Sequence, residues 1–441
     1  MGIILATAGS AVGLGNIWRF PYTVGQDGGA AFIILNIVCI LLLGIPGMVC
    51  EFIVGRNAGT NAVRAYGRLS GIKAWRLVGY MGILSSTIIL GVYSVVAGWC
   101  LHYLFASFFG RLNGDVAAIS QYFSNFSSSL FTPIWFALGF IVITHLVVSK
   151  GVRGGIERVS KLLMPILFVL LLIIVVASCM LPGAIKGVEF LLKPDFSKVN
   201  ADVFLDALGQ AFFSLSLGTA CLCTYASYFG RDINLFKSAG QIAFIDSMVA
   251  ILAGLMIFPA AFSVGVDADS GPSLIFITLP NVFNQAFASM PILGWVISLL
   301  FYALLSLAAL TSLMSLHEVS TAFFYEELHI TRDKGAVIVT VTTIIIGAFC
   351  SLSLGQFDGL RIGDKSLFDV FDFVTGQIFL PLGGFLTCLF LGWFVPKRLV
   401  KDEFTNWGTV SGRFFGVFLF LVRFVCPLAI LSIFLHQFNV I

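Results

Sequence analysis

The chain has 441 residues, of which 59% are hydrophobic and 11% are charged, and its net charge at pH 7 is +3. Soluble globular proteins carry about 25% charged residues, so this composition excludes an ordinary soluble enzyme or nucleic-acid-binding protein. It predicts a polytopic membrane protein whose surroundings are a lipid bilayer and which has no nucleic-acid partner.

Eleven apolar segments are long enough to cross a bilayer, which takes about 20 helical residues. We expect an all-α protein with helices at residues 1–21, 29–55, 77–109, 130–149, 156–181, 203–229, 238–266, 292–327, 335–353, 367–395 and 411–437. The third and the eighth exceed one bilayer thickness and should be tilted. The first runs directly into a glycine-rich motif, which argues against a cleavable signal peptide.

The basic residues are divided unequally between the loops. Seventeen of the 25 Lys and Arg residues lie near the loops that follow helices 2, 4, 6, 8 and 10, whereas six lie in the opposite loops. Cytoplasmic loops are enriched in Lys and Arg. We therefore expect a protein of the cell (inner or plasma) membrane with a cytoplasmic N-terminus and, after eleven spans, an external C-terminus.

Residues 9–16 are expected to interrupt the first helix. Three glycines fall within seven residues, and Asn16 and Arg19 follow inside the same apolar segment. Each internal glycine costs a helix about 1 kcal/mol relative to alanine, and unwound backbone at membrane depth survives only inside protein or beside a polar cavity. Glycines alone would favour a hinge or a close-packing face, whereas the Asn and the Arg beyond them favour a binding site.

The run Gly13-Leu14-Gly15-Asn16-x-Trp18-Arg19-Phe20-Pro21-Tyr22 strongly resembles the first-helix signature of the neurotransmitter:sodium symporter family. The resemblance continues through residues 28–32, 44–46 and 51–56 and extends to about residue 395. It is to the bacterial eleven-helix type, which includes leucine and multi-hydrophobic amino acid transporters. The resemblance implies a LeuT-like fold of two inverted five-helix repeats, residues 1–181 and 203–395, an additional helix at 411–437, and broken helices 1 and 6.

Helix 6 contains a second candidate break. Residues 212–219 place two serines and a glycine midway along an apolar run, a pattern that by itself indicates a kink. Breaks at corresponding positions of two transporter halves point to the substrate site. Glu51 lies deep in the second span, where an acid needs hydrogen-bond partners. The resemblance implies that Glu51 bonds the unwound part of helix 6.

The resemblance also implies two sodium sites beside the breaks. The first is expected at Ala11, Asn16, Ser214 and Asp246, and the second at Gly9, Val12, Ala308, Thr311 and Ser312. These positions offer oxygen ligands, which hard cations prefer. Asp246 lies at or near the position of a family Asn, and its fixed negative charge predicts independence of chloride; a protonated structural Asp is the alternative. The hydroxyls of Thr311 and Ser312 could instead bond only the preceding turn.

The substrate is expected between the same breaks. The implied substrate-binding residues are Ala11, Leu14, Gly15, Ile89, Tyr93, Phe213, Ser214, Ser216, Thr219, Ser312 and Leu316. Without the resemblance, an isolated Tyr such as Tyr93 is more often a core aromatic. Monoamine-transporting members carry an Asp at the position of Gly13. Gly13 therefore predicts a substrate with its own carboxylate, a zwitterionic amino acid that is hydrophobic or aromatic.

Two gates are implied. Arg19 and Asp372 would close the outer side, with Gln210 between them, and Tyr228 and Glu326 belong to the inner side. Family members normally have an N-terminal segment whose Arg seals the inner gate, whereas this chain starts inside helix 1. We therefore expect Glu326 to lack its Arg partner and the inner side to close poorly, which a truncated chain or a misplaced start codon would explain.

The predicted function is sodium-coupled import of an amino acid by alternating access, without a chloride requirement. An amino-acid sensor on the same fold, which binds without net transport, is the alternative. The paired gates argue against a channel. No nucleophile–base pair and no metal-protease motif is found in the sequence, so no enzyme activity is expected. The nine cysteines lie almost entirely in the spans and are expected to act as small apolar residues.

Overall fold

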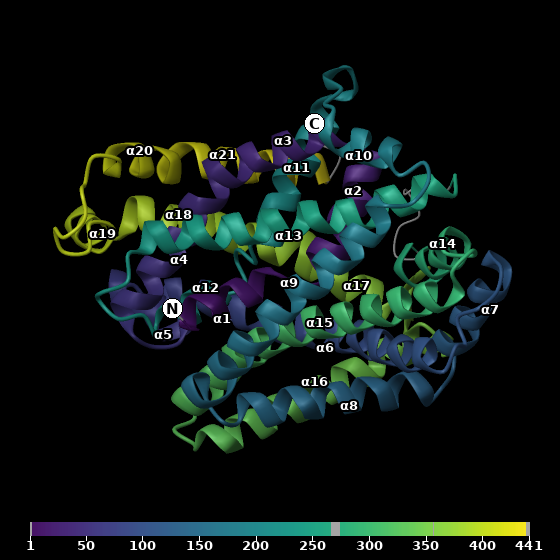
Figure 1. Ribbon diagram of the computed structural model, residues 1–441. Helices are drawn as coiled ribbons and strands as arrows, with labels where there is room; N and C mark the ends of the chain where they lie inside the picture. The colour runs from purple at the N-terminus through teal and green to yellow at the C-terminus, as the bar shows by residue number, and fades with distance from the viewer. Residues whose placement is uncertain (1, 266–273, 356, 438–441) are drawn as a thin grey trace.

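The computed structural model describes residues 2–265, 274–355 and 357–437, and these are almost entirely helical. Long helices run roughly side by side across the molecule (Figure 1). In the described part, the strands form one short antiparallel hairpin, in which β1 (Arg361–Ile362) pairs with β2 (Lys365–Ser366). An all-α membrane bundle satisfies its backbone hydrogen bonds within each helix, as a hydrocarbon environment requires.

Within the described residues, eight helical segments are long and apolar enough to cross a membrane, and a ninth qualifies as a pair bent by 73°, α7 (Val116–Ser127) with α8 (Thr132–Val148). The elements of the eight segments are α3 (Ala30–Cys39), η2 (Ile40–Gly44), α4 (Ile45–Ala58), η3 (Lys73–Trp75), α6 (Arg76–Phe108), η4 (Val152–Ile156), α9 (Glu157–Cys179), α13 (Leu235–Ser263), α15 (Pro291–Glu327), α16 (Arg332–Ser353), α17 (Leu367–Phe373), η8 (Val374–Phe379), α18 (Leu380–Leu389), η9 (Phe390–Phe394), α20 (Phe415–Phe420), η10 (Leu421–Val425) and α21 (Cys426–Gln437).

Two further predicted segments are interrupted helices. The first consists of α1 (Gly2–Ala11), η1 (Gly15–Arg19) and α2 (Phe20–Gln26), and the second of α11 (Ala201–Ser214) and α12 (Cys221–Ala226). The interruptions fall at residues 12–14 and 215–220 and overlap the two motifs that the sequence singled out, at residues 9–16 and 212–219. Each of the eleven predicted segments overlaps a continuous or an interrupted helix, although helix length alone does not establish eleven spans.

Several short elements were not predicted because they are too short and too polar to read as spans. They are α5 (Ala62–Ser70), α10 (Ile185–Leu192), η5 (Phe196–Lys198), η6 (Leu274–Thr278), α14 (Leu279–Ala286), η7 (Asp358–Leu360) and α19 (Lys397–Phe404). Figure 1 places α5 and α19 at one end of the bundle and α7, α10 and α14 toward the other. Short elements therefore gather at the two ends of the long helices.

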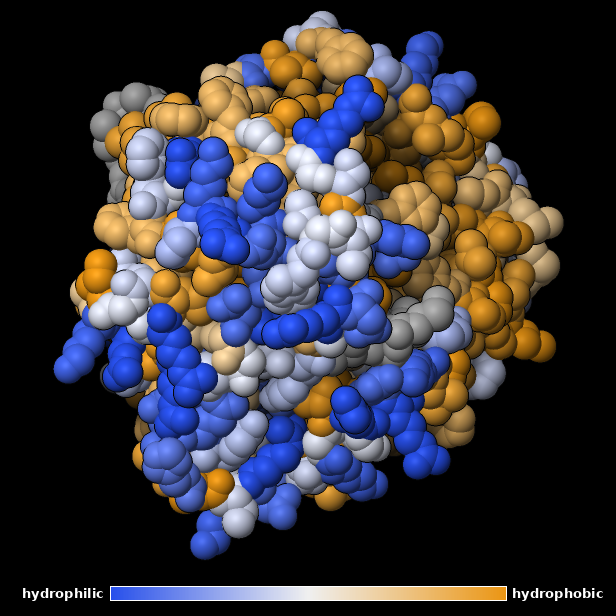
Figure 2. Space-filling view, turned by 90° about the vertical axis from the view of Figure 1, so that its left-hand side faces the viewer, coloured by the Kyte–Doolittle hydropathy of each residue, from blue (hydrophilic) through white to orange (hydrophobic). Residues whose placement is uncertain are grey.

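The surface agrees with a membrane environment. Large apolar side chains are exposed on the outer helices, including Trp135, Phe244 and Leu428. On the end of the molecule that carries α5 and α19, hydrophilic residues gather across the face, and hydrophobic residues lie toward its margins (Figure 2). A polar end above an apolar flank is the pattern that lipid imposes.

The interrupted helices lie in the interior of the bundle. Helix α12 packs against α4, and α1 packs against α9 and α15. Helix α15 in turn packs along α6. The two interruptions are thereby enclosed by continuous helices, which is the one place where irregular backbone is tolerated at membrane depth.

Candidate functional site

The interruption between α11 and α12 holds backbone in the left-handed region. Ser216, Gly218 and Ala220 have φ of 54°, 83° and 59°. A side chain at Gly218 would also overlap the carbonyl oxygen of Leu380 in α18, so a glycine is required there for space as well as for φ. Left-handed Ser and Ala cost of the order of 1 kcal/mol each and persist only where the surroundings hold them.

Glu51 supplies part of that support. Its side chain is 1% exposed on α4, and its carboxylate accepts hydrogen bonds from the backbone N–H groups of Gly218, at 2.7 Å, and Cys223, at 3.4 Å. One acid thus bridges the interruption and the first turn of α12. The structure brings Glu51 to the helix that the resemblance named for it.

Asn16, Ser214 and Asp246 form a buried polar cluster. The Ser214 hydroxyl donates to both carboxylate oxygens of Asp246, at 2.9 and 2.7 Å, and the Asn16 amide donates to Asp246 Oδ1 at 2.7 Å. Asp246 is 1% exposed, and no basic side chain within the described ranges forms an ion pair with it at 4.0 Å or less. The structure brings together three of the four residues predicted for the first sodium site, from η1, α11 and α13.

The donor set of this cluster fits a monovalent hard cation. It offers one carboxylate and one hydroxyl, and the predicted fourth ligand, Ala11, lines the adjoining cavity. The Asn16 side chain presents its amide nitrogen to Asp246 and its oxygen to the Gly13 N–H. Hard cations take such oxygen ligands. Within the described residues, no group of three or more His, Cys, Asp and Glu side chains could hold a metal ion. A site with a single acid suits sodium better than a divalent ion.

Thr311 joins α15 to the interruption of the first helix. Its hydroxyl donates to the carbonyl of Ala308 at 2.9 Å and lies 3.4 Å from the carbonyl of Val12. A Cβ at Gly9 would lie 3.5 Å from Thr311 Cβ, so the two helices approach closely. Ser312 faces Gly13, where a Cβ would overlap the Ser312 hydroxyl oxygen. The structure thus gathers the residues predicted for the second sodium site.

A cavity of about 50 Å³ lies between the two interruptions. Ten of the eleven predicted substrate-binding residues line it, and the exception is Leu14, which is buried outside the lining. The residues that line it are Ser10, Ala11, Gly13, Gly15, Ile89, Tyr93, Phe213, Ser214, Ser216, Thr219, Cys221, Ser312, Ser315, Leu316 and Leu380.

Four lining residues were missed by the sequence reasoning: Ser10, Cys221, Ser315 and Leu380. Ser315 lies one helical turn beyond Thr311 and Ser312, so the helical period could have identified it. Ser10 directly precedes Ala11, and Cys221 lies two residues after Thr219. Leu380 comes from α18 and carries no local signal, because only the packing of α18 against the interruption brings it there.

The outer-gate residues are not joined as expected. The Arg19 guanidinium lies 4.2 Å above the centre of the Phe213 ring, a cation–π contact at the cavity. No ion pair of 4.0 Å or less joins Arg19 to Asp372 among the described residues. The side-chain amide of Gln210 is buried without a hydrogen-bond partner in the same described set. Gln210 therefore does not bridge the two charged residues in this conformation.

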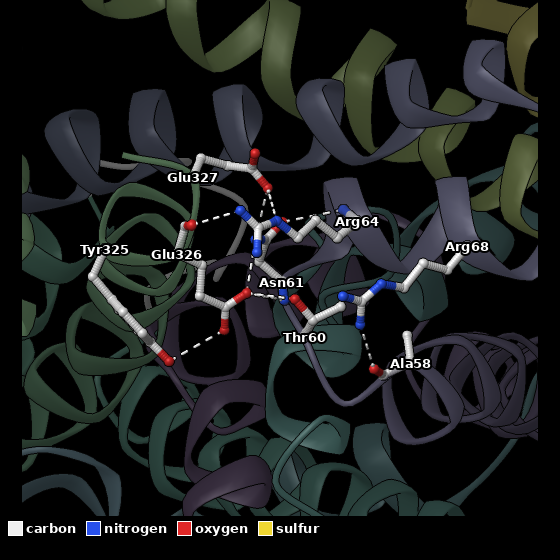
Figure 3. Close-up of polar contacts among 8 residues, drawn as sticks. All are labelled: Ala58, Thr60, Asn61, Arg64, Arg68, Tyr325, Glu326 and Glu327. Carbon is white, nitrogen blue, oxygen red and sulfur yellow. Dashed lines mark hydrogen bonds and ion pairs between the residues drawn. The ribbon is translucent and has the colours of Figure 1, made fainter. Parts of the chain in front are cut away.

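On the opposite side of the cavity, two acids of α15 have polar partners. Tyr228 donates to Glu318 at 2.8 Å, and Glu318 also forms an ion pair with Arg332. Glu326 accepts from the Thr60 hydroxyl at 2.5 Å and from the Asn61 backbone and side-chain nitrogens, both at 2.8 Å (Figure 3). Glu326 is thus bonded by the turn that follows α4.

Comparisons with known proteins agree with this geometry. The chain is 38% identical over 445 residues to the uncharacterized sodium-dependent transporter YhdH of Bacillus subtilis (strain 168), covering 100% of this chain and 97% of the relative. It is 26% identical to the sodium-dependent dopamine transporter of Bos taurus, covering 85% of this chain and 61% of that one.

The structure of MhsT in complex with L-phenylalanine matches with a TM-score of 0.89 and 39% identity, covering 98% of this chain and 97% of that one. This match confirms the predicted all-α, LeuT-like fold class. The sequence model of the sodium:neurotransmitter symporter family matches residues 1–126 and 128–441. These are membrane-embedded, sodium-dependent transporters and not enzymes, and the chain belongs to the sodium:neurotransmitter symporter family.

Proposed function

We propose that this protein is a sodium-coupled symporter that imports an amino acid by alternating access. The observation that carries the proposal is the convergence of two interrupted helices on one cavity, directly beside the buried cluster of Asn16, Ser214 and Asp246. Freed backbone groups at helix interruptions bind the charged ends of a substrate, and carboxylate and hydroxyl oxygens bind the ion. Substrate and ion would then share a site, so each raises the affinity for the other by the same factor.

The substrate is proposed to be a zwitterionic, hydrophobic or aromatic amino acid. Gly13 has no side chain, so the protein cannot supply a carboxylate from this position. The substrate then brings its own carboxylate to the N–H groups of Leu14 and Gly15 and to the Tyr93 hydroxyl. The solved complex of MhsT with L-phenylalanine, at 39% identity, supports an aromatic side chain.

The ion requirement is proposed to be two sodium ions and no chloride. The first would bind at Asp246 and its neighbours, and the second at the oxygens around Thr311. Asp246 carries a fixed negative charge beside the first site, and that charge balances sodium without a mobile anion. The residues of the chain would orient the ion and replace its water. The positive charge of the ion would then stabilise the substrate carboxylate, because electrostatic attraction is stronger in a site that excludes water.

The orientation is proposed from the polar end face. The end that carries α5 and α19 is hydrophilic (Figure 2), and these two helices belong to the basic loops after helices 2 and 10, so we assign this end to the cytoplasm. Residues 1–181 and 203–395 would form the two inverted repeats, and 411–437 the additional helix. The interruptions in the first helix of each repeat support that division.

The test of the substrate proposal is equilibrium binding of labelled L-phenylalanine to the purified protein in sodium, with competition by two analogues. L-leucine should compete, because it keeps both charged groups. Phenethylamine, which keeps the ring and the amine but lacks the carboxylate, should compete at least about 100-fold more weakly, since the carboxylate partners would be left unpaired. Equal competition by phenethylamine would contradict the substrate class.

A further inference from the structure

A polar contact joins the turn after α4 to the end of α15. Arg64 Nε pairs with Glu327 at 2.7 Å, and Arg64 Nη2 donates to the backbone oxygen of Glu326 at 2.7 Å. Thr60 and Asn61 meet the Glu326 carboxylate, as described above. Figure 3 shows these side chains converging from the two segments. We call Thr60, Asn61 and Arg64 with Glu326 and Glu327 the α5 clamp.

The clamp is built from enclosed groups at its centre. Asn61 is 1% exposed and Thr60 is 6% exposed, whereas the Arg64 and Glu327 side chains are about a quarter exposed. Hydrogen bonds to an ionised acceptor are roughly twice as strong as neutral ones, and partial burial protects them from water. The Asn61 side chain also caps α5 by accepting a hydrogen bond from the Arg64 N–H. The same residue therefore fixes the start of α5 and contributes to the clamp.

The clamp joins two helices that both reach the site. Helix α4 carries Glu51, which holds the interruption between α11 and α12, and α15 carries Thr311 and Ser312. The clamp lies on the end of the bundle where Figure 1 places α5. Separation of α4 from α15 at this end would break every contact in the clamp at once.

We propose that Thr60, Asn61 and Arg64 are gating residues, which hold the α5 end of the cavity closed until their contacts with Glu326 and Glu327 break. This inference rests on the proposed alternating-access function. A contact that is present in one conformation and absent in the other biases the equilibrium by its own free energy. Loss of the clamp should therefore increase the population that is open toward α5, with no change in the residues that bind substrate or ion.

The test uses the native thiol of Cys221, which lines the cavity and is free. In the full chain with its other eight cysteines replaced, a membrane-impermeant maleimide is added to inside-out vesicles and the rate at which Cys221 reacts is measured. Arg64→Glu and Glu327→Arg should each raise this rate about 5-fold or more, because each places like charges together. The double variant, Arg64→Glu with Glu327→Arg, should return the rate to within about 2-fold of the parent.

The chain offers a matched control one turn along α5. Arg68 has the same charge, but it donates a hydrogen bond to the Ala58 backbone oxygen at 3.4 Å (Figure 3). Arg68→Glu should leave the rate unchanged, and right-side-out vesicles should show no increase for any variant. If Arg64→Glu does not fold, Glu327→Gln is compared with Arg68→Gln in the same way.

Two results would overturn the clamp: an Arg64→Glu rate no higher than that of Arg68→Glu, or a double variant that stays fast. Labelling that responds equally from both sides of the membrane would also overturn it, because that indicates loosened packing. A parent rate that does not respond to sodium would contradict the proposed function instead. The clamp is tested by the ratio of Cys221 labelling rates between variants, whereas the proposed function is tested by the response of the parent to sodium. Failure of the clamp is therefore distinguishable from failure of the proposed function.

Discussion

Asp246 is buried in α13 with two hydrogen-bond donors, Asn16 and Ser214, and is 1% exposed. A buried carboxylate without a basic partner in the described part of the chain needs either a cation or a proton. The cation account and the protonated-Asp account differ in what happens when the charge is removed. If Asp246 is a protonated structural acid, a neutral residue in its place should leave ion binding almost unchanged. If Asp246 is an ion ligand, the same replacement should weaken ion binding.

Asp246→Asn should lower the apparent sodium affinity at least about tenfold in chloride-free buffer, which corresponds to about 1.4 kcal/mol. Added chloride should restore part of that affinity, because a mobile anion then replaces the lost charge. The measurement is sodium-dependent binding of labelled L-phenylalanine with chloride or gluconate as the anion. Asp333→Asn, an exposed acid at the start of α16, is the control. Unchanged sodium affinity in Asp246→Asn would refute the role of Asp246.

Gly13 and Gly9 provide a matched pair in the first helix. Gly13→Ala should weaken substrate binding about 10- to 100-fold, because the added methyl displaces the Ser312 hydroxyl that lines the cavity, and loss of such a polar contact costs about 1–3 kcal/mol. Gly9→Ala should have a much smaller effect, since its Cβ would meet Thr311 at the ordinary distance of 3.5 Å. Equal effects in a binding assay would show that the space at Gly13 does not decide the substrate.

At the element scale, the two interruptions were predictable and their geometry was not. Three glycines in residues 9–15, and two serines with a glycine in 212–219, signal weak helix in any context. The left-handed conformations of Ser216 and Ala220 depend on partners that are distant in the sequence, such as Glu51. No local pattern indicates them. Propensity thus locates an interruption, and tertiary contacts determine its shape.

Glu51→Gln should destabilise the interruption between α11 and α12. The amide keeps one acceptor and places a donor against a backbone N–H, so one charge-assisted hydrogen bond is lost, which costs about 1.5–3 kcal/mol. We expect weaker substrate binding and a lower melting temperature in detergent. Glu157→Gln, which removes only a half-exposed pair with Lys161 on α9, is the control. If Glu51→Gln and Glu157→Gln behave alike, Glu51 does not support the site.

At the element scale, the gate residues could be identified from the sequence, but the contacts between them could not. Arg19, Asp372 and Gln210 were identified from their motifs, but whether they touch depends on the conformation, and the structure holds Arg19 against Phe213. Tyr228 bonds Glu318 because both lie on packed helix faces, a pairing that sequence spacing does not reveal. The α5 clamp was missed because α5 is a short polar helix between two spans. Contacts between segments that are far apart in the sequence had no signal in either segment.

At the scale of the whole molecule, long apolar helices surround a polar centre. The composition, with 11% charged residues, predicted a polytopic membrane protein, and the two motifs at residues 9–16 and 212–219 predicted the polar centre. The predicted spans overlap the observed helices with boundaries that differ by a few residues, since hydropathy marks the lipid-facing length and capping sets the ends. The fold class could therefore be predicted from the sequence, whereas whether each side of the cavity is open or closed could not.

The central claim is coupling of amino-acid movement to sodium, and its most direct test is uptake of labelled L-phenylalanine into proteoliposomes. An inward sodium gradient, applied with or without chloride, should drive accumulation above the external concentration, and replacement of sodium by potassium should abolish it. Sodium-dependent binding without accumulation would favour a sensor. Uptake that is the same in sodium and potassium would contradict the account.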